Sequence, residues 1–179
     1  MQFRVALVVF LAGLLVAAGA ARAQDAPGWR QGDCSSSQIV LPDGMKPAEC
    51  AIGPATTVLG KTCVNENYAV TEKGHFHVRV MVDRRNGCAL VKPETFDQVK
   101  EYSGMPPQMR EKTTGPQTLP DGSMVGFFAG GRCVVFWKPG RPQYFGFRDV
   151  FYGDLCKPQG EKMDVAAATA FLSGVKSTY

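Results

Sequence analysis

One aromatic-rich stretch, residues 126–152, constrains this chain more than any other part of its 179 residues. It holds nine aromatic residues, and short segments containing Gly or Pro interrupt it twice. Residues 132–138 and 143–152 are rich in β-branched and aromatic side chains, the residue types that favour strands. The sequence Lys-Pro-Gly-Arg-Pro at 138–142 supplies turn residues between them. We therefore predict a β-hairpin at the centre of a sheet.

Before this hairpin, the chain changes to short β-like runs separated by turns that contain glycine. Residues 64–70, 75–82 and 88–91 form three such runs, which predicts an antiparallel meander. In the middle run two sets of residues alternate: Phe76, Val78, Val80 and Val82 form one, and His75, His77, Arg79 and Met81 form the other. Because strand side chains alternate between the two faces, we expect the first set to face the core and the second to be partly solvated. Residues 123–128 predict one more strand.

Two segments carry helix signals. In residues 93–103, Thr95 and Gln98 have the spacing of a capping box. In residues 161–175, apolar side chains recur every three to four positions, and Asp164 could cap a helix there. The fold class that follows is α+β, an antiparallel β-sheet of about five to six strands with two helices on one face.

The amino-terminal residues 1–23 have the pattern of a secretory signal peptide. Arg4 lies near the start, an apolar run covers residues 5–18, and Ala-Arg-Ala at 21–23 precedes Gln24. The alternative is a membrane anchor, but the run is shorter than the ~20 apolar residues that span a bilayer. No later segment is apolar enough to span one, so we expect no transmembrane segment after cleavage. The expected location is periplasmic or secreted, in a bacterium.

Cleavage would leave residues 24–179, which by length form a single domain with an irregular arm at 24–62. Removing residues 1–23 takes away two arginines and no acids, so the formal net charge falls from +4 to +2. A charge this small creates no broad field that would attract nucleic acid or a membrane surface. We therefore expect no nucleic-acid partner.

All six cysteines follow the predicted signal peptide, and they are Cys34, Cys50, Cys63, Cys88, Cys133 and Cys156. An even number in an exported chain predicts disulfides, formed in an oxidising compartment, which would also tether the arm. Of the possible pairings we favour the short-loop closures: Cys34–Cys50, Cys63–Cys88 and Cys133–Cys156. Each would contribute about 3 kcal/mol to stability. The chain has no C-x-x-C pair, which argues against a cysteine zinc site.

The two histidines, His75 and His77, are the candidate metal ligands. Residues two apart on a strand point to the same face, so both imidazoles could reach one ion. A third ligand would have to be a carboxylate such as Glu72 or Asp83. The alternative is a pair of exposed histidines on the solvated face of a strand.

Other catalytic signatures are weak. Ser123 lacks the G-x-S-x-G context of a nucleophile elbow, and an even number of cysteines gives no reason to expect a free thiol nucleophile. A carboxylate pair for glycoside hydrolysis could form in the fold, but no acidic residue is singled out for it. We identify no catalytic residue and no cofactor.

The central hairpin offers a candidate binding face. Alternation over residues 143–152 directs three phenylalanines toward the core: Phe145, Phe147 and Phe151. It directs Tyr144, Arg148 and Tyr152 to the opposite face, with Trp137 beside them across the turn. Tyr, Trp and Arg are enriched where proteins bind partners. The alternative is that the second helix covers this face and that Arg148 alone reaches solvent.

These observations favour a non-enzymatic binding or inhibitor-like module that presents the aromatic and basic face to a protein or an envelope polymer. Two alternatives stay open. One is a small exported hydrolase or metal-binding protein that uses His75 and His77 or a carboxylate pair. The other is a structural subunit of an envelope assembly. Because the sequence has no recognisable catalytic arrangement, an enzyme is the less favoured class.

Overall fold

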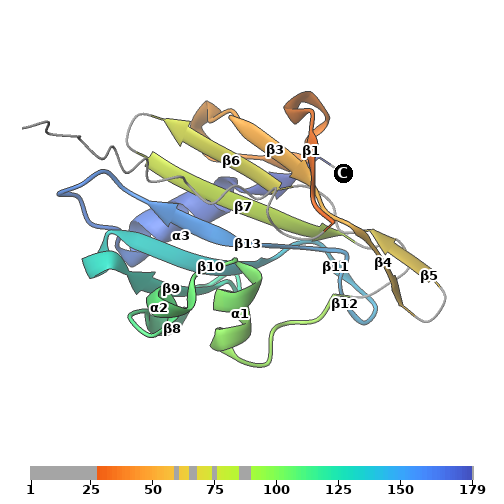
Figure 1. Cartoon of the computed structure of the whole chain (residues 1–179). Helices are drawn as coiled ribbons and strands as arrows, with labels where there is room; N and C mark the ends of the chain where they lie inside the picture. The colour runs from red at the N-terminus through yellow and green to blue at the C-terminus, as the bar shows by residue number, and fades with distance from the viewer. Residues whose placement is uncertain (1–27, 59–60, 65–67, 74–75, 85–89, 179) are drawn as a thin grey trace, which may run out of the picture.

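The computed structural model describes residues 28–58, 61–64, 68–73, 76–84 and 90–178. An eight-stranded antiparallel sheet with the order β1-β3-β6-β7-β13-β10-β9-β8 forms the centre of the fold (Figure 1). Helices pack against this sheet, so the predicted α+β class is confirmed. The sheet is larger than the five to six strands that the sequence predicts, because the amino-terminal arm and the segment after the first helix also contribute strands.

The predicted hairpin lies at the middle of the sheet. Its two strands are β10 (Cys133–Pro139) and β13 (Asp149–Cys156), which pair from Cys133 opposite Cys156 to Pro139 opposite Val150. On the far side of β13 lies β7 (Phe76–Arg84), and on the far side of β10 lies β9 (Met124–Phe128). The pair β10–β13 therefore joins the two halves of the sheet.

The turn of this hairpin comes later than predicted. The segment 138–142 does not reverse the chain, because the N–H groups of Gly140 and Arg141 both donate to Asp149 and extend the pairing outward. Two short strands, β11 (Pro142–Gln143) and β12 (Gly146–Phe147), then pair with each other. The chain reverses at residues 144–145, so the single predicted strand over 143–152 is interrupted by a turn.

The outer strands complete the sheet. β7 pairs with β6 (Tyr68–Lys73) as the meander prediction requires. Beyond β6 lie two strands from the arm, β3 (Glu49–Ile52) and β1 (Arg30–Gly32), where the sequence predicts irregular structure. At the opposite edge, β8 (Thr114–Thr118) pairs with β9.

Two further pairs of strands lie outside the main sheet. β4 (Ala55–Val58) pairs with β5 (Lys61–Val64), and β2 (Ile39–Val40) pairs with β14 (Lys176–Ser177) near the end of the chain. Half of the third run of the predicted meander, 88–91, lies outside the described residues. Its described part does not extend the meander, because Leu90 bridges to Phe147 of β12 instead.

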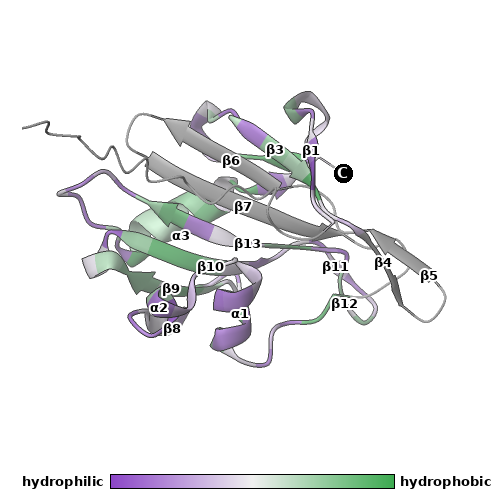
Figure 2. Ribbon diagram, in the orientation of Figure 1, coloured by the Kyte–Doolittle hydropathy of each residue, from purple (hydrophilic) through white to green (hydrophobic). Residues whose placement is uncertain are grey.

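The helices lie on opposite faces of the sheet, which corrects the prediction of one face. Phe136 of β10 packs with Phe171 of α3 (Val165–Gly174), whereas its neighbour Trp137 packs with Val99 of α1 (Phe96–Tyr102). Both sets of alternating β10 side chains are apolar, so both faces need a cover. Figure 2 shows the hydrophobic residues gathered on β9, β10 and α3, and hydrophilic residues along α1.

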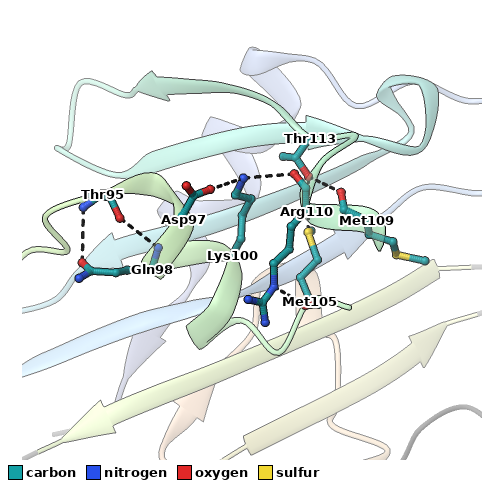
Figure 3. A network of polar contacts seen from close by, with 8 residues as sticks. All are labelled: Thr95, Asp97, Gln98, Lys100, Met105, Met109, Arg110 and Thr113. Atoms are coloured by element: carbon teal, nitrogen blue, oxygen red, sulfur yellow. Dashed lines mark hydrogen bonds and ion pairs between the residues drawn. The ribbon is translucent and has the colours of Figure 1, made fainter. Parts of the chain in front are cut away.

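Both predicted helices have the predicted caps. Asp164 caps α3 by accepting a hydrogen bond from the Ala167 N–H, and Thr95 and Gln98 form a capping box at the start of α1. Lys100 of α1 also donates to the backbone oxygen of Arg110 at 3.1 Å (Figure 3). Arg110 ends α2 (Pro107–Arg110), a short helix that the sequence did not predict. These bonds tie α1 to the chain that follows it.

Two of the three predicted disulfides are confirmed. Cys34–Cys50 joins the segment after β1 to β3 within the arm, and Cys133–Cys156 joins register partners at one end of the central pair, with a Cα–Cα distance of 4.1 Å. The third predicted pair, Cys63–Cys88, stays a prediction, because residue 88 lies outside the described part of the chain. The predicted signal peptide, residues 1–23, lies outside it as well. Among the described residues, no helix has the length and apolar character needed to cross a membrane.

Lys138 attaches α3 to the sheet through its side chain. Its Nζ donates to the backbone oxygen of Leu172, near the end of α3, at 2.6 Å. Burial lowers the pKa of this amine below its usual 10.5, although the Asp121 carboxylate, 3.9 Å away, opposes the shift and Lys176 adds to it. The fold therefore disfavours the charged form of Lys138 relative to the unfolded chain.

We expect Lys138→Met to remove part of the alkaline rise in stability. The folded-state pKa lies below the unfolded-state value, so the unfolded chain binds more protons as pH rises through the folded pKa toward 10.5. In this window the free energy of unfolding of the wild-type protein should rise with pH relative to that of the variant. Chemical unfolding at a series of pH values between about 8 and about 10.5 measures the difference. Exposed Lys112 provides the control, as Lys112→Met, and parallel wild-type and Lys138→Met profiles would contradict the assignment.

Candidate binding site

Two aromatic side chains project from the turn between β11 and β12. Tyr144 is 91% exposed and Phe145 is 74% exposed. Their rings lie edge to face, with centroids 4.6 Å apart and an interplanar angle of 88°. Large apolar side chains this exposed have no role in the core, so the pair forms a convex aromatic knob on the surface. We call residues 141–148 the hairpin tip.

The backbone of the tip does not require aromatic residues at these positions. Gly146 takes the positive backbone angle, φ 114°, whereas neither Tyr144 nor Phe145 has a positive φ. Turns of this size usually carry Gly, Asn, Asp or Ser. Two adjacent aromatic residues here depart from local preference, and neither ring packs in the core. Departures of this kind concentrate at functional sites.

A buried carboxylate anchors the base of the tip. The Asp149 side chain is 1% exposed, and its Oδ1 accepts the Arg141 backbone N–H at 2.7 Å. Its Oδ2 accepts from the Arg141 guanidinium, 2.9 Å from Nη2 and 3.3 Å from Nε. A buried charge is stable only when it is paired and hydrogen-bonded in this way. A side chain at Gly140 would collide with this carboxylate, which explains the glycine before Arg141.

A second set of contacts fixes β12. Leu90 and Phe147 exchange two backbone hydrogen bonds, at 2.9 and 2.7 Å. The Phe147 ring also packs edge to face against Trp137, with centroids 5.7 Å apart. Val91, the next residue after Leu90, is 73% exposed and therefore adds apolar surface near the base of the tip. The turn residues project into solvent from a backbone that is held on both sides.

The four residues predicted to form one binding face do not lie together. Trp137 is 2% exposed and packs in the core under α1, so it cannot contact a partner in this fold. Tyr152 is its register partner on β13 and is half-buried, with its ring 6.1 Å from that of Tyr102. Tyr144 and Arg148 are exposed at the tip.

Phe145 is the site residue that the sequence analysis missed, because strict alternation assigned it to the core. Alternation holds along a strand but fails across a turn, and the chain turns at Phe145. The glycine that follows, Gly146, was the available signal for that turn.

The surface around the tip is basic. Residues 138–148 contain three basic residues and no acid. Arg148 is exposed, and the side chain of Arg141 is 38% exposed although it pairs with Asp149. The aromatic knob therefore projects from a cationic surrounding.

The metal and nucleophile hypotheses gain no support here. His75 lies outside the described residues, and His77 lies in β7 with Glu72 and Cys156 as register partners, so the metal site stays a prediction. In the described part of the chain, no three His, Cys, Asp or Glu residues gather as metal ligands. Ser123 is fully buried, which does not suit a nucleophile that must contact substrate.

Comparisons with protein-family models, with curated proteins and with solved structures found no match to this chain.

The two arginines of the tip should respond differently to the same substitution. Arg141→Met leaves the buried Asp149 carboxylate without its charged partner, and we expect it to lower the free energy of unfolding by about 2–3 kcal/mol. Arg148→Met removes an exposed guanidinium and should change it by less than about 0.5 kcal/mol. Denaturant unfolding of the oxidised proteins compares the two. Equal effects of both substitutions would mean that the Arg141–Asp149 pair does not anchor the tip.

Proposed function

We propose that this protein is a non-enzymatic binding or inhibitor-like module and that the hairpin tip is its contact surface for a macromolecular partner. The observation that carries the proposal is the combination of two strongly exposed aromatic rings, Tyr144 and Phe145, with an anchored backbone beneath them. Exposed aromatic side chains that are held in place are typical of binding hot spots. The partner is a protein or an envelope polymer.

The free energy gained by burying the two aromatic side chains is large enough for a hot spot but not for a whole interface. Burying one aromatic side chain removes about 150–250 Å² from water, at about 25 cal/mol per Å². Two rings therefore supply a gross gain of about 7–12 kcal/mol, against which association costs at least about 4 kcal/mol. An anchored loop loses little conformational entropy on binding, which keeps that cost low. Further contacts, for which Arg148 and Val91 are available, would complete a stable complex.

The proposed location is the periplasm or the extracellular medium. The disulfides Cys34–Cys50 and Cys133–Cys156 support an oxidising compartment, and the signal-peptide pattern at residues 1–23 supports export. The hydrolase, metal-binding and structural-subunit hypotheses rest on the sequence alone.

Affinity capture tests the proposal. The oxidised protein, purified after export, is immobilised and exposed to envelope and extracellular fractions of the cells that make it. We expect one specific component to be retained, with at least about tenfold less retained by Tyr144→Ala/Phe145→Ala because both hot-spot rings are lost. Val165→Ala, which truncates an exposed apolar residue on α3, is the matched control and should capture as wild type does.

Two outcomes would contradict the proposal. One is equal capture by the wild-type protein and the double variant, and the other is no specific capture by either. Circular dichroism and the unfolding midpoint establish that the double variant is folded. Because both side chains are exposed, we expect its stability to change by less than about 0.5 kcal/mol.

A further inference from the structure

We propose that the partner of the hairpin tip is a folded protein whose surface has an apolar pocket, wide enough for two aromatic rings, with carboxylates around its rim. This inference rests on the proposed function and specifies the chemistry of the partner. It follows from the shape of the knob, from its rigidity and from the charges around it.

The shape of the knob requires a concave partner. Tyr144 and Phe145 lie edge to face at the outermost turn of the hairpin, so both rings project together. A pocket can enclose both rings on several sides and remove most of their surface from water. Hot-spot side chains typically occupy such desolvated pockets. The Tyr144 hydroxyl additionally needs a hydrogen-bond partner once it is buried, which a protein pocket can supply.

The rigidity of the tip favours a protein over a membrane. Aromatic and basic residues also bind anionic lipid surfaces, so a membrane is the strongest competing partner. A fluid interface, however, adapts to a flexible loop as well as to a fixed one. Anchoring by Asp149 on one side and Leu90 on the other pre-organises the rings, which benefits binding to a surface of matched shape.

The charges around the knob indicate acidic groups on the partner. Arg148 is exposed, while Asp149, the acid next to the tip in sequence, is buried and already paired with Arg141. Guanidinium groups bind carboxylates through two parallel hydrogen bonds. A pocket rimmed by Asp or Glu side chains is therefore complementary to this surface in charge.

The end of the sheet that carries the tip has room for a full interface. A stable protein complex buries about 800 Å² on each partner, more than two rings provide. Val91 extends the apolar surface beside β12. Figure 1 shows that β4 and β5 extend from the same end of the sheet as β11 and β12. A protein bound over the tip could reach these elements as well.

Photo-crosslinking from the tip identifies what contacts it. The photoreactive analogue benzoylphenylalanine replaces Phe145 in the protein expressed in its own cells. A control protein carries the analogue at Tyr102, which is 51% exposed and lies at the end of α1, outside the tip. We expect Phe145 adducts to contain peptides of one protein, with the attachment site near Asp or Glu residues. The Tyr102 protein should not give the same adduct.

Once the partner found in the Phe145 adducts has been purified, measuring its affinity for the wild-type protein and for charge variants tests the charge requirement. We expect Arg148→Glu to weaken binding by at least about tenfold, more strongly at low than at high salt, because it reverses a charge that faces carboxylates. Lys112→Glu changes the total charge equally at an exposed position outside the tip and should weaken binding by less than about threefold.

The outcomes separate this inference from the proposed function. Crosslinks to lipid or glycan, equal effects of Arg148→Glu and Lys112→Glu, or binding of the purified wild-type protein to anionic phosphatidylglycerol vesicles that is lost in Tyr144→Ala/Phe145→Ala would overturn the acidic protein pocket. Glycan adducts or equal effects of the two charge reversals would leave the proposed function intact, whereas lipid adducts or vesicle binding would contradict its macromolecular partner as well. Crosslinking of Phe145 to no macromolecule would contradict both proposals.

Discussion

The pairing of β10 with β13 is the interaction on which the rest of the structure depends. Seven register pairs join these strands, and the sheet would separate into two halves without them. The pair is fastened at both ends by different chemistry. The Cys133–Cys156 disulfide closes one end, and the buried Asp149 carboxylate holds Arg141 at the other. The second fastening positions the hairpin tip, so the same pairing that builds the core also presents the proposed binding surface.

The aromatic residues of this hairpin divide into two groups with different roles. Phe136 and Trp137 alternate along β10 and fill the cores on opposite faces, under α3 and α1. Phe147 connects the groups, because its ring packs on Trp137 while its backbone pairs with Leu90. Tyr144 and Phe145 lie beyond the reach of either helix and remain in solvent. The buried aromatic rings thus hold β12 in place through Phe147, and the exposed rings of Tyr144 and Phe145 are the ones that a partner can contact.

The sequence predicted the elements well and their placement less well. Strand propensity and helix caps are local, so the central hairpin, the β6–β7 pair and the capping box of α1 could be predicted. The choice of a face for each helix is not local, although apolar residues at both Val135 and Phe136 indicated that both faces would be covered. The binding residues were assigned by alternation alone. That argument failed at Trp137, which α1 buries, and at Phe145, because the Asp149 carboxylate delays the turn.

The central claim is that the tip is an ordered part of the sheet rather than a loose loop, and backbone ¹⁵N relaxation of the oxidised protein tests it most directly. We predict order parameters near about 0.85 for the amides of residues 141 and 143–148, the value of rigid backbone and the same as for β10 and β13. Values below about 0.6 at Tyr144 and Phe145 would contradict the account. The aromatic rings would then be exposed because the loop is disordered, and their arrangement would carry no information about a partner.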